Sequence, residues 1–220
     1  MRKLCIALSA LFAALQVPAQ EPVRHGGIPD EVFYLMPSFS DGVIFFRGQM
    51  PAQGKLNICA VDNTLRFIDK SGQELEATGG DNILKVKIDT VSFLRDQGIF
   101  YRMYPLSPEL GVALQRDVKV RTDAKEGAYG TTSQTTAVRQ YGSVYADGAL
   151  YNLESGKTYP YEVTEEVYLY KGDTVFPLSK KNLKKLFPGK KDLIDSYFKA
   201  GNPLPATVSD ALNLLKLWVD

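Results

Sequence analysis

Residues that build metal centres and redox sites are scarce in this chain. Its 220 residues include one histidine, His25, and two cysteines, Cys5 and Cys59. A zinc site needs three or four histidine, cysteine or carboxylate ligands, so one histidine and one distant thiol do not make one. Neither a G-x-S-x-G elbow nor a glycine-spaced phosphate loop is present. These absences exclude the common metal, phosphate-loop and serine-hydrolase signatures, and we expect no cofactor.

Long hydrophobic runs are also absent, except at the N-terminus. Residues 4–17 form an apolar run of 14 residues, whereas a membrane-spanning helix needs roughly 20. The run follows Arg2 and Lys3 and leads into small residues before Gln20, which is the charge, apolar, small order of a secretory signal. We therefore predict a signal peptide over 1–19, cleavage after Ala19, no transmembrane span, and a soluble exported protein.

Removal of the signal peptide leaves Cys59 as the one cysteine of the mature chain, which excludes an internal disulfide. About 200 residues suffice for one domain whose hydrophobic core needs no covalent cross-link. Cys59 belongs to an alternating segment, where cysteine usually acts as a small buried hydrophobe rather than as a nucleophile.

Charge is distributed unevenly along the chain. Residues 180–220 carry eight lysines and four aspartates, a net charge of +4, whereas residues 20–179 carry a net charge of −5. A basic segment attracts acidic polymers and headgroups. We expect no nucleic-acid partner, because the predicted export signal removes the protein from the cytoplasm.

Short apolar segments separated by turn formers predict a mainly β fold. Residues 20–30 lack periodicity and are predicted to be a flexible leader, and 31–178 is predicted to be an antiparallel sandwich or open barrel. The predicted strands are 31–36, 42–48, 55–61, 64–69, 82–94, 98–106, 112–122, 142–153, 159–170 and 174–178. The segment DKSGQE (69–74) has glycine at its fourth position, which favours a hairpin turn over a calcium loop. A polar segment, 123–140, is predicted to be a long loop.

The last forty residues have helical periodicity. Ser179 is a candidate N-cap for a helix over 180–187 that stops at Pro188-Gly189, and further helices are predicted over 191–199 and 207–219. The apolar side of the second helix is predicted to comprise Leu193, Ile194, Tyr197 and Phe198. We expect residues 179–220 to form a tail of two or three short helices packed on the β domain.

Tyrosine is concentrated late in the β region, with seven tyrosines in residues 141–170. They are interpreted either as a stacking surface for a glycan or protein partner, or as ordinary strand residues packed in a sheet. Tyr159 and Tyr161 share one side of a strand, as do Tyr168 and Tyr170. The candidate surface residues of this kind are Tyr129, Tyr141, Tyr159, Tyr161, Tyr168 and Tyr170.

The segment KKNLKKLFPGKK (180–191) also has two interpretations. In a helix, Leu183, Leu186 and Phe187 face inward and the lysines lie on the opposite arc, which is typical of a solvated amphipathic helix. The functional alternative is an anion-binding surface. Its candidate residues are Lys180, Lys181, Lys184 and Lys185.

The segment YLYKGDTVFPLSKKNLKKLFPGKKDLIDSYFKAGN (168–202) and the loop GAYGTTSQTTA (127–137) resemble exported proteins of unknown function that are common in Bacteroidota. In that group a β segment is often followed by a tail of the form K-x-L-x-K-x-FP-x-KK-x-x-I-x-x-Y/F. The matching positions are Lys181, Leu183, Lys185, Phe187, Pro188, Lys190, Lys191, Ile194 and Tyr197. The resemblance implies a Gram-negative envelope setting, in the periplasm or at the outer surface, and supplies no catalytic residues.

These patterns favour a non-enzymatic binding or interaction protein of the cell envelope. Its candidate partners are an envelope protein, a glycan or an anionic lipid headgroup. The alternative is a glycan- or peptide-directed hydrolase that uses a carboxylate pair, which predicts a pocket lined by two acids and aromatic residues. Glu165 and Glu166 are not that pair, because neighbours in a strand point to opposite faces.

Overall fold

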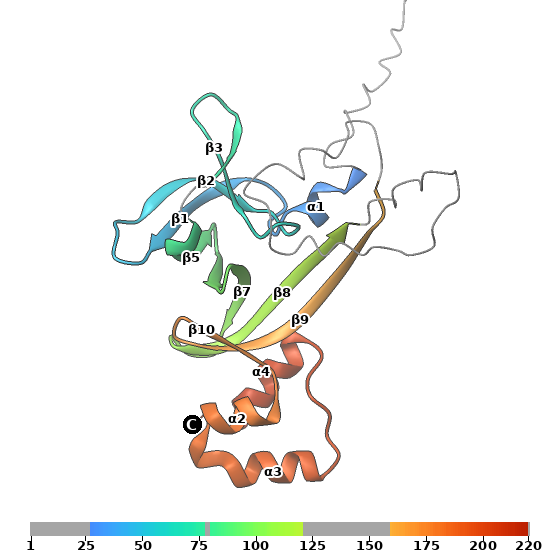
Figure 1. Ribbon diagram of the computed structural model, residues 1–220. Helices are drawn as coiled ribbons and strands as arrows, with labels where there is room; N and C mark the ends of the chain where they lie inside the picture. Colours follow the sequence, from blue (N-terminus) through green and yellow to red (C-terminus); the bar gives the residue numbers. More distant parts are fainter. Residues whose placement is uncertain (1–26, 78–79, 121–158, 220) are drawn as a thin grey trace, which may run out of the picture.

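The computed structural model describes residues 27–77, 80–120 and 159–219, which form one open antiparallel sheet with helices at its C-terminal end (Figure 1). The ten strands lie in the order β10-β9-β8-β7-β6-β5-β1-β2-β3-β4. Their bounds are β1 (Ser40–Phe46), β2 (Ala52–Ile58), β3 (Leu65–Ile68), β4 (Glu74–Glu76), β5 (Ile83–Ile88), β6 (Val91–Asp96), β7 (Ile99–Pro105), β8 (Leu110–Val120), β9 (Tyr161–Lys171) and β10 (Thr174–Pro177). The predicted mainly antiparallel β fold with a tail of short helices is confirmed.

Tight turns between successive strands explain why these segments pair as hairpins. The predicted turn after β3 is confirmed: Gly72 has a φ of 83°, and the Asp69 carboxylate accepts the N–H groups of Ser71 and Gln73, each at 2.8 Å. The prediction of one strand over 82–94 was wrong. Asp89, with a φ of 51°, turns the chain between β5 and β6, because a short polar side chain tolerates this left-handed backbone.

The N-terminal prediction also needs correction. Residues 31–33 are not a strand but part of a short helix, α1 (Asp30–Phe33), whose first turn is held by the Pro29 carbonyl, the acceptor of the Val32 and Phe33 N–H groups. Ile28, which lies within the predicted leader of residues 20–30, is buried. Cys59 is buried in a cluster of apolar residues, as predicted, with Asp62 as a polar neighbour.

Two hydrophobic clusters lie on opposite faces of the strands that follow β6. On one face, Val112 of β8 and Leu169 of β9 contact the tail helices. On the other face, Ala113 and Tyr170 pack with Leu94 and Tyr101. This alternation follows from the two-residue period of a strand. It places successive residues of β8 and β9 in different cores.

The tail forms the three predicted helices: α2 (Lys180–Leu186), α3 (Lys191–Lys199) and α4 (Val208–Lys216), with the 3₁₀ turn η3 (Pro188–Lys190) between the first two. A second 3₁₀ turn, η2 (Gly80–Asn82), precedes β5. Figure 1 shows the helices gathered beneath β8, β9 and β10. Ser179 caps α2 by accepting the Asn182 N–H at 3.2 Å, and Thr207 caps α4 in the same way.

The buried side of α3 differs from the prediction at one position. Ile194 is fully buried, whereas Leu193 is 55% exposed. The buried arc continues through Tyr197 and Phe198, which lie three and four residues after Ile194. Leu193, about 100° around the helix from Ile194, therefore lies beside this arc rather than within it.

Candidate functional site

The amphipathic order of α2 places its lysines at the surface of the tail. Leu183 and Leu186 are buried against the sheet and the other helices, so residues at the remaining helical positions face outward. The lysines form two pairs spaced by four residues, Lys180 with Lys184 and Lys181 with Lys185. This spacing brings the members of each pair onto one side of the helix. The inward-facing apolar residues and outward-facing lysines agree with the sequence prediction.

Five lysines surround one shallow hollow of about 750 Å³. Four come from α2, and the fifth, Lys191, begins α3 after the Pro188-Gly189 turn. We call this set the lysine surface: Lys180, Lys181, Lys184, Lys185 and Lys191. All four lysines selected from the sequence belong to it. Lys191 was not among the residues predicted from the sequence, because the turn that brings it back to α2 depends on tertiary packing.

A single carboxylate lies between two of these lysines. Asp195 of α3 accepts Lys180 Nζ and Lys184 Nζ, each at 2.7 Å. Hydrogen bonds from the ammonium groups of Lys180 and, secondly, Lys184 lower the pKa of the Asp195 carboxyl to about 2. Within the described ranges, Lys181, Lys185 and Lys191 form no ion pair. Lys185 instead places its ammonium 5.0 Å from the centre of the Phe176 ring.

The chemistry of the lysine surface is attraction of anions. It combines five ammonium groups with one carboxylate, so it retains positive charge after internal pairing. Ammonium groups donate several hydrogen bonds each and act as mobile point charges, which suits phosphate or carboxylate groups on a flexible ligand. Among the described residues, the hollow is lined by lysines alone.

The predicted tyrosine surface is divided by the sheet. Tyr168 and Tyr170 face away from the helices, and Tyr101 and Tyr168 stack edge-to-face with ring centres 5.2 Å apart. The Tyr168 hydroxyl donates to Glu166 at 2.9 Å. Tyr170 is only 1% exposed, so it is a packed residue and not part of an open surface. Tyrosines and lysines therefore do not form one continuous binding face.

The remaining tyrosine predictions have different outcomes. Tyr159 packs partly buried beside the cluster around Cys59, and Tyr161 is 39% exposed at the start of β9. Tyr129 and Tyr141 lie outside the described residues, as do the predicted signal peptide, the 123–140 loop and the strand at 142–153.

A hollow over β1 and β2 contains two carboxylates but has a different lining from the predicted hydrolase site. Gly42 and Gly54 are partners across the β1–β2 pair and, with Asp41 and Asp89, line a hollow of about 590 Å³. No aromatic residue lines it. A further pocket, between β6 and β7, contains Tyr104 and Tyr170 but no acid. Neither one combines two acids with aromatic residues.

The described part of the chain has neither a cluster of metal-ligating side chains nor a membrane-spanning helix. No group of three or more histidine, cysteine or acidic side chains there is arranged to hold a metal ion. No helix there has the length and apolar character needed to cross a membrane. Burial raises the pKa of the Cys59 thiol well above its usual value, which disfavours the reactive thiolate.

Comparison of the chain with protein-family models, curated proteins and solved structures gave no significant match.

Proposed function

We propose that this chain is an exported, non-enzymatic binding protein that attaches to phosphate-bearing lipid headgroups of the cell envelope through the lysine surface. The observation that carries the proposal is the gathering of five lysines around one hollow with a single carboxylate among them. Lysine near an anionic membrane contributes about 1 kcal/mol. Three lysines without an internal ion pair among the described residues therefore supply a useful affinity.

The arrangement of the tail supports this role. Buried Leu183, Ile194 and Leu215 hold the helices on the sheet, so the lysines are displayed by a packed element rather than by a loose chain end. Capping of α2 by Ser179 orients the first turn, which bears Lys180 and Lys181. A fixed array of charges binds a charged surface with a smaller loss of conformational freedom than a disordered basic tail.

The direct test is sedimentation of the mature protein, residues 20–220, with vesicles. We expect binding to phosphatidylcholine vesicles that contain phosphatidylglycerol, little binding to phosphatidylcholine alone, and release by salt at roughly 0.5 M, because salt screens exposed charges. A soluble acidic polysaccharide, polygalacturonate, is the competitor. Stronger binding to polygalacturonate than to the vesicles would assign the surface to a glycan instead, and binding to neither would reject the proposal.

A charge-matched pair of variants locates the binding surface. Replacement of Lys181, Lys185 and Lys191 by serine is expected to weaken vesicle binding about 100-fold, at about 1 kcal/mol per lysine. The control replaces three exposed lysines of the sheet region, Lys55, Lys70 and Lys87, by serine and leaves the tail intact. Equal losses in the two variants would show that net charge, not the lysine surface, drives binding.

Export is tested separately. N-terminal sequencing of the protein from a Gram-negative host should give Gln20 as the first residue, if the predicted signal peptide is removed after Ala19. If the protein is found in the cytoplasmic fraction with residues 1–19 still attached, the prediction of export is wrong. That result would leave the lipid-binding measurement unaffected.

A further inference from the structure

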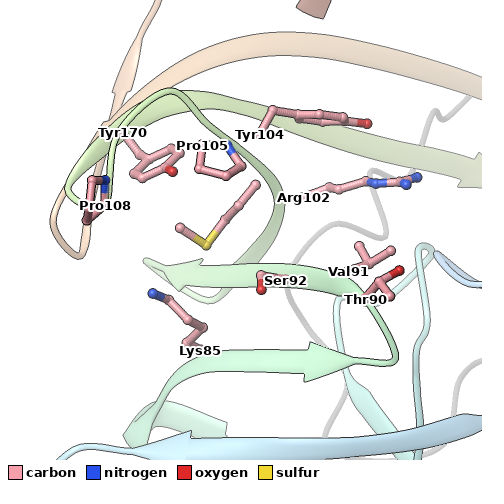
Figure 2. A pocket seen from close by; sticks show the side chains of 10 residues that line it. Lys85, Thr90, Val91, Ser92, Arg102, Tyr104, Pro105, Pro108 and Tyr170 are labelled. Carbon is pink, nitrogen blue, oxygen red and sulfur yellow. The ribbon is translucent and has the colours of Figure 1, made fainter.

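A pocket of about 410 Å³ lies where β6 and β7 separate (Figure 2), and it shares no lining residue with the lysine surface. The two strands pair from Asp96 and Ile99 up to Phe93 and Arg102, and the ladder ends there. Continuing the same register would pair the next residues of β6 with Met103 and those that follow. Those residues line the pocket instead: Thr90, Val91 and Ser92 on one side, and Met103, Tyr104 and Pro105 on the other.

Pro105 gives a physical reason why the ladder does not resume further along β7. Leu106 donates its N–H to the Leu110 carbonyl on the β8 side. Because successive residues of a strand direct their backbone groups to opposite sides, Pro105 faces β6 rather than β8. Proline has no N–H to donate, so the β6–β7 ladder is not able to continue normally at this position.

The charged residues that line the pocket in the described part of the chain are both basic, Lys85 of β5 and Arg102 of β7. Glu109, next to the lining residue Pro108, acts electrostatically on Tyr170 but is not among the residues that line the pocket. Thr90 and Ser92 add hydroxyl groups. The apolar part of the wall consists of Val91, Met103, Pro105 and Pro108. A ligand that matches this wall carries a negative group on an apolar body.

Tyr170 adds a buried polar group that is not satisfied. Its side chain is turned into the pocket (Figure 2) and is almost fully buried, and its hydroxyl has no hydrogen-bond partner among the described residues. The ring fits against Gly111, since a Cβ at Gly111 would lie 2.7 Å from the Tyr170 ring. A buried hydroxyl without a partner destabilises a protein unless a ligand supplies one.

We propose that this pocket binds a small carboxylate with an apolar body, held by the Lys85 ammonium and the Tyr170 hydroxyl. The ammonium opposes the negative charge, and the hydroxyl donates to a carboxylate oxygen. The apolar residues exclude water from the remainder of the ligand. A pocket of this size is within the range that holds small organic ligands. The site is separate from the lysine surface. A failure of carboxylate binding here would therefore leave the proposed lipid binding untouched, and the reverse also holds.

The probe is hexanoate, with hexanamide as its neutral counterpart, titrated into the mature protein and followed by backbone NMR shifts. We expect hexanoate to move the signals of Val91, Ser92 and Met103 and to bind with a dissociation constant on the order of 1 mM. Hexanamide is expected to bind about tenfold more weakly, because it lacks the charge that a charge-assisted hydrogen bond requires. Absence of hexanoate binding, or equal binding of both probes, would overturn the proposal.

Three variants test the assigned residues. Lys85→Met and Tyr170→Phe are each expected to weaken hexanoate binding about tenfold. Lys87→Met is the matched control, because Lys87 lies two residues further along the same face of β5 but does not line this pocket. Tyr170→Phe should unfold at the same or a higher temperature than the unmodified protein, which shows that it folds. Affinity within a factor of two of the unmodified protein in either pocket variant would contradict the assigned role.

Discussion

The carboxylate of Asp96 accepts the backbone N–H of Val175 at 2.9 Å, linking β6 to β10 across 79 positions of the chain. β10 is the last strand of the sheet, so its outer N–H groups lack a neighbouring strand. Such edges promote unwanted pairing between molecules. The Asp96 side chain therefore protects the edge and holds it over the Tyr101 and Tyr170 cluster, to which Val175 also contributes.

Replacement of Asp96 by alanine is expected to lower the free energy of unfolding by about 1–2 kcal/mol, the value of a hydrogen bond to a charged group that is partly exposed. Urea denaturation measures this change, and hydrogen exchange at Val175 should become faster. The control is Asp173→Ala in the exposed turn between β9 and β10, which should change stability by less than about 0.5 kcal/mol. Equal effects would mean that the Asp96 hydrogen bond contributes nothing specific.

Gly111→Ala is expected to be strongly destabilising. The added Cβ would lie 2.4 Å from the backbone oxygen of Tyr104 and 2.7 Å from the Tyr170 ring. A strand backbone moves little, so the overlap should cost about 2–3 kcal/mol. Gly54→Ala is the matched control, because its nearest contact would be an ordinary 3.7 Å from a Leu56 methyl group. A thermal-unfolding shift of the same size in both variants would refute this explanation.

Tyr170→Phe should raise the free energy of unfolding by about 1 kcal/mol in the absence of ligand, because it removes a buried hydroxyl that has no partner among the described residues. Tyr34→Phe should instead lower the free energy of unfolding. The Tyr34 hydroxyl donates to Glu74 at 2.8 Å, and its loss should cost about 1 kcal/mol. Chemical denaturation of the two variants side by side gives the comparison. Destabilisation by Tyr170→Phe would show that the hydroxyl is satisfied in the folded protein.

The pH dependence of stability should include a contribution from Asp195. Its pKa is about 2 in the folded protein, below the ordinary value of 3.8, because Lys180 and Lys184 donate to it. A lowered pKa means that the stabilisation is present above about pH 4 and is lost as the pH falls toward about 2. The Asp195→Asn variant lacks this carboxylate and its pH-dependent stabilisation. The difference in free energy of unfolding between the unmodified protein and the variant should therefore shrink as the pH falls from about 4 toward about 2. NMR titration of the Asp195 carboxyl measures its midpoint directly.

Local signals explain why the tail was predicted well. Ser179, Thr207 and Pro188-Gly189 mark helix ends through short-range hydrogen bonds and backbone restrictions. The contact of Asp195 with Lys180 was not predictable in this way, because it depends on the angle at which α3 returns across α2. The positive charge of this segment was evident from the sequence, but the ion pairs of Lys180 and Lys184 with Asp195 were not.

Strand prediction was limited by contacts between distant segments. The shared side of Tyr168 and Tyr170 followed from the two-residue period of a strand. Which face would be buried depended on the pairing of β8 with β9 and on the position of Val175. The β6–β7 pocket was missed for the same reason, since Lys85 and Tyr170 line one pocket only after five strands have paired. Pro105 inside a predicted strand was the one local signal of an interrupted ladder.

The register of β8 with β9 has a consequence for folding kinetics. Their nearest ladder partners, Val120 and Tyr161, are separated by forty intervening residues, whereas β5 to β8 are joined by short turns. In a flexible chain, joining two positions that far apart costs about 3 kcal/mol of chain entropy, against about 1 kcal/mol for a short hairpin. The tail helices pack on Val112 and Leu169, one from each of these strands, so they dock only after the distant pair has formed. Fluorescence of Trp218, the single tryptophan of the chain and a member of that helical core, should therefore follow the slowest phase of refolding.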